Sequence, residues 1–227
     1  MLFSRIYVIL SQENNFLNKE NTMRIYASEI RAAARENLKG HWTEAALLIF
    51  VYVLIVGSLS SIPLVGSGIS LLFIPMGWGV TCAFLAMKRG EDDPMNISCL
   101  IVGYKDFVRI FLTLLLQGVY VFLWSLLLVI PGIIKSLSYA MTSYVLRDYP
   151  ELRYNGAIEM SMAMMQGHKW ELFYLYLTFI GWGILCVFTL GVGLFWLEPY
   201  VETSIANFYE EVKEDYLTGD ASRYSKE

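Results

Sequence analysis

The residues best suited to chemistry are ionisable side chains that lie inside long apolar stretches. Lys135 follows the pair Pro131-Gly132, and Glu198 and Glu202 lie one helical turn apart in the last apolar stretch. A charged side chain within a bilayer is costly, so residues of this kind are usually functional. We therefore predict a polar interior, to which neighbouring hydroxyl and amide side chains would contribute. Its candidate residues are Lys135, Ser136, Ser143, Glu198, Glu202, Thr203 and Asn207.

Two interpretations of the charged residues remain open. In the first, Lys135 pairs with Glu198 inside a helix bundle and Glu202 lines the polar interior. In the second, Lys135 extends its stem toward the outer surface and Glu198 lies at the level of the lipid headgroups. The first predicts a functional cluster, and the second predicts only two residues that anchor helix ends.

A second set of candidates follows two glycines. A polar, amphipathic segment reaches Gly40 or Gly167, and a long apolar segment begins directly after it. Histidine and tryptophan at such a boundary suit the membrane–water interface better than they suit a catalytic base. We predict that these residues anchor the chain at the interface: His41, Trp42, His168, Lys169 and Trp170.

No motif of a known catalytic or metal centre accompanies these residues. The sequence has no hydrolase elbow, zinc-binding helix or phosphate loop, and no nucleophile, base and orienting group occur together. Cys82, Cys99 and Cys186 are far apart and odd in number, which favours neither a disulfide framework nor a metal site. We therefore expect no cofactor and no enzymatic activity.

The elements that must position the candidates are transmembrane helices. The 227 residues are 56% hydrophobic and 17% charged, whereas soluble domains carry about 25% charged residues. The apolar residues form blocks of about 20 residues, the length that crosses a bilayer as a helix. The fold class is therefore all-α, in a polytopic membrane protein. The net charge of −4 does not by itself exclude nucleic acid, but no basic cluster suggests it, so nucleic acid is not an expected partner.

The chain repeats one unit three times. Gly40, Gly103 and Gly167 recur at nearly equal intervals, and each stands between an amphipathic segment and an apolar one. Each unit is predicted to consist of an interfacial amphipathic helix and a helical hairpin, which gives six spans in all. The repeats cover residues 24–90, 95–150 and 155–209, with hairpin turns at residues 63–68, 131–132 and 191–193.

Charge then predicts the orientation. Residues 1–22 would be a non-native or disordered extension, residues 23–209 the membrane domain, and residues 210–227 a charged tail. With six spans, all of the 17 Lys and Arg residues except Lys135 fall on one side. The positive-inside rule therefore places both termini in the cytoplasm. Five spans would instead move the tail to the outside.

Several motifs together resemble a known family. From Met23 to about Tyr209 the chain resembles the bacterial integral membrane family called domain of unknown function 975. The resemblance implies a multi-pass protein of the bacterial cytoplasmic membrane, and it supplies no activity or substrate. The motifs are Ala34-Arg35-x-x-Leu38-x-Gly40, Pro131-Gly132-Ile133-Ile134-Lys135, Asp148-x-Pro150, Gly167-x-Lys169-x-x-Leu172-Phe173, Phe179-Ile180-Gly181-Trp182, Pro199-Tyr200 and Phe208-Tyr209.

Two functions from different classes follow. The first is a non-enzymatic membrane module that interacts with membrane lipids or with membrane protein partners. The alternative is a small transporter or channel-like protein whose polar interior surrounds Lys135, Glu198 and Glu202. An enzyme embedded in the membrane ranks third, and the sequence predicts no oligomeric state.

Overall fold

The computed structural model describes residues 26–60 and 71–218. The predicted N-terminal extension, the predicted turn at residues 63–68 and the last residues of the tail lie outside this part. Apart from turns, the described residues form helices only, which agrees with the all-α prediction. A first helix covers Tyr26–Asn37. The others are α2 (Trp42–Ser60), the short 3₁₀ helix η1 (Leu71–Phe73), α4 (Ile74–Arg89), α5 (Cys99–Val102), α6 (Phe107–Leu127), α7 (Val129–Tyr139), α8 (Thr142–Asp148), α9 (Asn155–Met164), α10 (Lys169–Phe188) and α11 (Leu194–Thr218).

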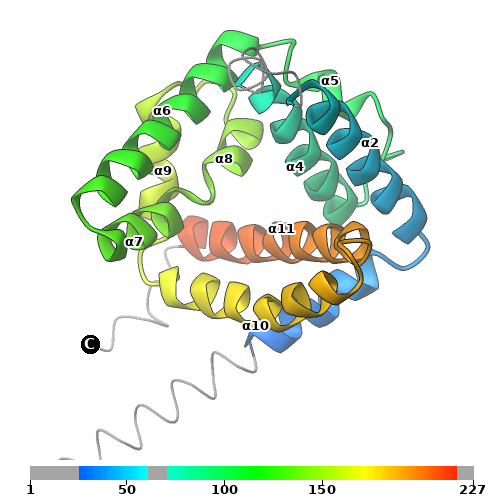
Figure 1. The fold of residues 1–227 in the computed structure, drawn as a ribbon. Coiled ribbons are helices and arrows are strands. Elements are labelled where there is room, and N and C mark those ends of the chain that lie inside the picture. The colour runs from blue at the N-terminus through cyan, green and yellow to red at the C-terminus, as the bar shows by residue number, and fades with distance from the viewer. Residues whose placement is uncertain (1–25, 61–70, 219–227) are drawn as a thin grey trace, which may run out of the picture.

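Helix α11 is the centre of the arrangement. It crosses the middle of the molecule above α10, with α2 and α4 on one side and α6 to α9 on the other (Figure 1). Every residue from Thr203 to Tyr209 is buried. A helix that is buried all round must be covered by neighbours on all faces. Neighbouring helices therefore enclose this part of α11.

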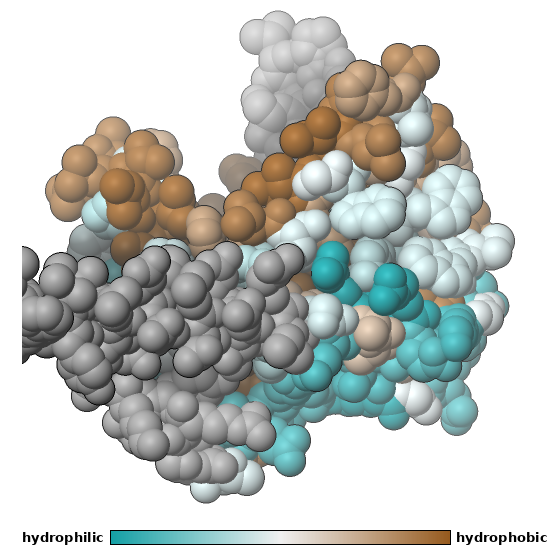
Figure 2. Space-filling model, turned by 90° about the horizontal axis from the view of Figure 1, so that it is seen from below, coloured by the Kyte–Doolittle hydropathy of each residue, from teal (hydrophilic) through white to brown (hydrophobic). Residues whose placement is uncertain are grey.

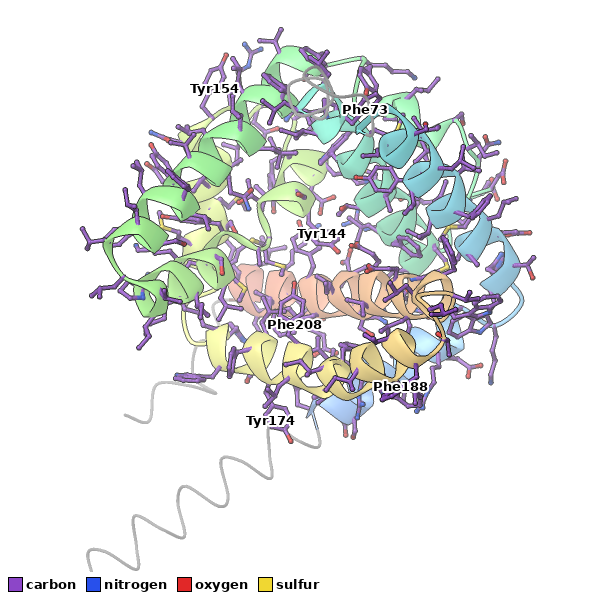
Figure 3. The ribbon with its side chains drawn as sticks, viewed as in Figure 1. Phe73, Tyr144, Tyr154, Tyr174, Phe188 and Phe208 are labelled. Atoms are coloured by element: carbon purple, nitrogen blue, oxygen red, sulfur yellow. The ribbon has the colours of Figure 1, made fainter. Side chains whose placement is uncertain are left out.

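The core consists of two clusters that meet along α11. The larger one joins the Tyr26–Asn37 helix, α4, α6, α8, α9, α10 and α11, and the smaller one joins α2, α4 and α5, so α4 contributes buried residues to both. Tyr144 stacks on Tyr209 with ring centroids 4.8 Å apart. Tyr144 and Phe208 both lie in the interior, whereas Phe188 at the end of α10 is exposed (Figure 3).

Among the residues that the structure describes, four helical stretches are long and apolar enough to cross a membrane: Leu71–Arg89, Phe107–Leu127, Val129–Asp148 and Lys169–Phe188. A fifth is obtained if the helix Tyr26–Asn37 and Trp42–Ser58, which are bent by 95°, count as one broken span. The chain is thus a helical protein with four to five candidate spans. The predicted sixth span, α11, is not among them, because Glu198, Glu202 and a charged C-terminal half reduce its hydropathy.

The outer surface is strongly apolar in places. The face shown in Figure 2 divides into a hydrophobic upper part and a hydrophilic lower part. The five consecutive residues Leu126 to Ile130, between α6 and α7, are each between 64% and 73% exposed. Soluble monomers rarely expose continuous apolar patches of this kind, so the pattern fits contact with lipid or with another protein.

Two of the three predicted unit boundaries have the same backbone conformation. Gly40 and Gly167 have φ angles of 85° and 86°, a left-handed conformation that glycine adopts without steric cost. Gly103 has a φ of −61°, so the middle boundary turns differently. Its glycine has another cause, because a Cβ there would lie 2.2 Å from the Pro75 carbonyl oxygen.

Two predicted boundaries are wrong. Pro131-Gly132 does not form the second hairpin turn, because α7 already begins at Val129 after the extended residue Leu128. Proline fits the first turn of a helix, where its missing N–H would have no helical partner. The tail was predicted to begin at residue 210, but α11 continues to Thr218. Val212 is fully buried, which explains why the helix continues.

Candidate functional site

A pocket of about 410 Å³ lies between α2, α4 and α11, near the turn that joins α10 to α11. Most of its wall is apolar, and the exceptions come from one aromatic hydroxyl and two carboxylates. The residues that line it are Ile49, Tyr52, Val53, Gly77, Val80, Gly191, Leu194, Phe195, Glu198 and Glu202.

The two carboxylates are the predicted Glu198 and Glu202. Both are on α11, one helical turn apart, so they share a face of the helix. Among the described residues, neither forms a hydrogen bond or an ion pair. Pro199 lies between them and has no N–H, so the Phe195 carbonyl loses the helical donor that residue 199 would otherwise supply. The pocket is therefore rich in acceptors.

Lys135 does not belong to this pocket. It is on α7, which packs on α6, and its ammonium group lies 5.0 Å from the centroid of the Trp124 ring. A lysine over an indole ring makes a cation–π contact. The pairing of Lys135 with Glu198 is not observed, because the early start of α7 keeps this helix beside α6 and away from the pocket.

The other polar candidates have local partners. The Ser136 and Thr203 hydroxyls donate to carbonyls in their own helices, and Ser143 accepts a bond from the Trp78 indole through its carbonyl. Asn207 accepts a 2.9 Å bond from the Asn37 side chain, which joins α11 to the first helix. These residues stabilise the bundle, and only the two glutamates face the pocket.

The predicted interfacial anchors differ in exposure. His41 Nδ1 lies 2.8 Å from Glu44 Oε2, and His168 Nδ1 lies 2.9 Å from Glu171 Oε2. Trp170 is exposed, as an anchor would be, and its ring packs on Phe173. The remaining three do not share this exposure: Trp42 packs beside Tyr200, Lys169 is half-buried and His168 is buried.

His168 is therefore not a headgroup anchor in this structure. Besides Glu171, its Nε2 atom lies 3.9 Å from Asp215 Oδ2 near the end of α11. The sequence could not show this contact, because residue 215 was assigned to a tail. The continued helix covers the imidazole ring and removes it from the surface.

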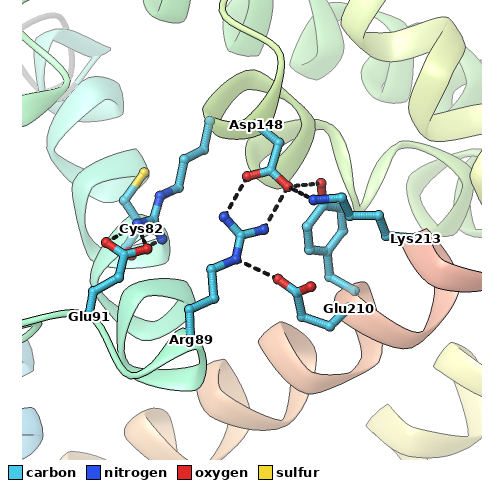
Figure 4. Close-up of polar contacts among 8 residues, drawn as sticks. Cys82, Arg89, Glu91, Asp148, Glu210 and Lys213 are labelled. Carbon is cyan, nitrogen blue, oxygen red and sulfur yellow. Dashed lines mark hydrogen bonds and ion pairs between the residues drawn. The ribbon is translucent and has the colours of Figure 1, made fainter. Parts of the chain in front are cut away.

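A charged junction, which the sequence analysis missed, joins the C-terminal ends of α4, α8 and α11 (Figure 4). We define it by Arg89, Asp148, Tyr209, Glu210 and Lys213. The Arg89 guanidinium donates to both Asp148 oxygens at 2.8 and 2.7 Å and to Glu210 at 2.7 Å. Asp148 Oδ2 also accepts from the Tyr209 hydroxyl at 2.8 Å and from Lys213 at 2.5 Å.

The neighbouring residues reinforce this junction. Arg147 donates to both oxygens of Glu91, at 2.7 and 2.8 Å, and to the Cys82 carbonyl at 2.7 Å. The Asp148 side chain is only 6% exposed and is surrounded by donors. Such a saturated network holds helix ends together and leaves no free group for a ligand. Its only signal in the sequence is that Arg89 and Asp148 both end return helices.

The described residues offer little for nucleophilic or metal chemistry. Burial raises the pKa of the Cys99 thiol to about 11, so the thiol stays protonated near neutral pH. A protonated thiol is a poor nucleophile and a poor metal ligand. Within residues 26–60 and 71–218, no group of three or more His, Cys, Asp or Glu side chains could hold a metal ion.

Comparison with known proteins gives one result. The family model described as "Protein of unknown function (DUF975)" matches residues 23–135 and 125–216. No curated protein and no solved structure matches the chain. The two matched segments cover most of the sequence and include the pocket and the charged junction. They also include the left-handed turns at Gly40 and Gly167, which we call the glycine hinges. The chain therefore belongs to the DUF975 family of proteins of unknown function.

Proposed function

We propose that this protein is a non-enzymatic integral membrane module of the bacterial cytoplasmic membrane, which acts through membrane lipids and membrane protein partners. The observation that carries the proposal is the exposed apolar run Leu126 to Ile130. Hydrocarbon or another protein must cover such a surface, because its exposure to water is unfavourable. The exposed Val187, Phe188 and Leu190 extend the same property to the end of α10.

The module would consist of three units and six spans, with both termini in the cytoplasm. The hinges at Gly40 and Gly167 support this, since both have the same positive φ angle and are followed by the same histidine–glutamate contact. The charged junction also supports it, since it gathers the C-terminal ends of the return helices of all three units. Charged groups at these ends suit a membrane–water boundary.

The absence of enzymatic activity is part of the proposal. It is supported by the protonated state of Cys99 and by the engagement of His168 with Glu171 and Asp215. Neither side chain is available as a nucleophile or base on an open surface.

Photo-crosslinking in living cells tests the module directly. A photoreactive amino acid is introduced at Leu127 on the apolar run, and at the exposed Glu214 of α11 as a matched control. We expect lipid adducts or a discrete protein adduct at Leu127 and a different, water-quenched product at Glu214. Equal quenching by water at both positions would refute the proposal.

A small transporter or channel-like protein is the second candidate. The specific observation in its favour is the pocket that reaches Glu198 and Glu202. Cation flux into liposomes that contain the purified protein should then be lost in Glu202→Gln, while Glu214→Gln keeps it. Flux that is unchanged in Glu202→Gln would exclude a pathway through this pocket.

A further inference from the structure

We propose that the pocket between α2, α4 and α11 binds an organic cation that carries an apolar body. This ligand class goes beyond the membrane module proposed above. It uses the pocket that favours the transporter, but it concerns binding and does not require transport. The charges, the lining and the shape of the pocket all suit such a ligand.

The charges of the pocket are uncompensated. Glu198 and Glu202 lie on one face of α11, about 5–6 Å apart at their Cβ atoms. Within the described part of the chain, no lysine or arginine nitrogen lies within 4.0 Å of either carboxylate. Glu198 is exposed and Glu202 is partly buried, and two like charges one helical turn apart repel each other. A cation bound between them would relieve this repulsion.

Three basic residues, on α4, α7 and α11, have partners outside the pocket. Lys135 lies over Trp124 on α6, and Arg89 and Lys213 are saturated at the charged junction. A cationic ligand in the pocket would supply a compensating charge that the ion pairs of the described residues do not provide.

The lining favours an organic cation over a metal ion. Calcium takes six to eight oxygen ligands, and magnesium requires a near-octahedral set. The pocket supplies oxygen from only three side chains, those of Tyr52, Glu198 and Glu202. The rest of its wall is aliphatic or aromatic, and it suits an apolar body. The rings of Tyr52 and Phe195 can also attract a positive charge through their faces.

The shape of the pocket also suits a small organic molecule. Its volume of about 410 Å³ lies within the range of about 300–1,000 Å³ found for ligand pockets. Gly77 helps to shape the wall, because a Cβ at this position would lie 3.2 Å from the Tyr52 hydroxyl. The absent side chain thus lets Tyr52 lie against α4 and reach the pocket.

Two ions of the same shape and opposite charge test the proposal. The full-length protein is purified in a non-ionic detergent, and binding of tetraphenylphosphonium and of tetraphenylborate is followed by the shift in unfolding temperature and by calorimetry. Tetraphenylphosphonium should stabilise the protein in a saturable manner, and tetraphenylborate should not. Specific stabilisation by a bound ligand follows from its preference for the folded state.

Matched variants assign the binding to the pocket. The double variant Glu198→Gln with Glu202→Gln should weaken tetraphenylphosphonium binding by about 10- to 100-fold, as expected when charge-assisted contacts are lost. Glu214→Gln removes the same charge from the exposed end of α11 and should bind like the unchanged protein. Leu194→Trp keeps both carboxylates, fills the pocket and should also abolish binding, which covers the case in which the double variant does not fold.

Three results would overturn the proposal: no binding of tetraphenylphosphonium by the folded protein, equal binding by the folded double variant, or equal binding by the folded Leu194→Trp variant. Stabilisation by magnesium alone would also contradict it. Binding without flux in liposomes would support the site and remove the transporter candidate. The crosslinking result at Leu127 is independent of all these outcomes.

Discussion

The hinge at Gly40 and the hinge at Gly167 share a local sequence and differ in their surroundings. Both glycines have a φ near 85°, and in both a histidine at the start of the next helix contacts a glutamate three residues later. The His41 and Glu44 side chains are 44% and 59% exposed, whereas those of His168 and Glu171 are 8% and 9% exposed.

The comparison shows that the local sequence determines the turn, whereas the burial of the histidine and glutamate side chains depends on the rest of the fold. In the third unit the C-terminal part of α11 brings Asp215 toward His168. In the first unit the corresponding pair stays at the surface. The same motif is thus a surface feature at one hinge and part of the interior at the other, and substitutions can separate the two contributions.

The middle boundary should give the largest effect. Gly103→Ala introduces a Cβ that would lie 2.2 Å from the Pro75 carbonyl oxygen, although its φ of −61° suits any residue. Overpacking against backbone should cost about 1–3 kcal/mol or more. Unfolding of the detergent-solubilised variant measures this cost, and wild-type stability would show that α4 and α5 do not approach so closely.

The histidine–glutamate contacts should give the next effect. Glu171→Ala removes a buried hydrogen-bond partner and should cost about 1–3 kcal/mol, whereas Glu44→Ala should cost less than about 0.5 kcal/mol. Both changes remove the same charge from a helix N-terminus, so the difference isolates burial. Equal losses in thermal unfolding would contradict the distinction between the two hinges.

The two hinge glycines should give effects of similar size, which makes the difference between them small. Gly40→Ala and Gly167→Ala each place a Cβ on a residue with positive φ, which costs about 1–2 kcal/mol. No atom lies within 4 Å of a Cβ built at Gly40, so backbone strain alone should act there. The free energies of unfolding of the two variants should differ by less than about 1 kcal/mol. A much larger loss of stability in Gly40→Ala would show that the role of Gly40 is not conformational.

The sequence predicted features that are determined by residues close together in the chain, and not those that depend on how helices pack. Glycine before an apolar segment marked the left-handed turns at Gly40 and Gly167. Glu198 and Glu202, predicted to contribute to a polar interior, line a mostly apolar pocket, and the predicted pairing of Glu198 with Lys135 is not observed.

The predicted pairing of Lys135 with Glu198 was wrong because the position of Lys135 depends on where α7 begins. The sequence did not decide this, since proline suits both a turn and the first turn of a helix. The charged junction was missed because Arg89, Asp148 and Lys213 meet only after three helices have packed.

The proposed six-span topology puts Gly40 and Gly167 on the cytoplasmic side and the α10–α11 turn, which lies near the pocket, on the other side. Substituted-cysteine labelling in intact cells tests it most directly, with Cys82, Cys99 and Cys186 replaced by alanine. The two test positions are Val192→Cys at the α10–α11 turn and Glu36→Cys before the first hinge, both of which are exposed. A membrane-impermeant maleimide should label residue 192 from outside and residue 36 only after the cells are opened. Labelling of both from the same side would contradict the account.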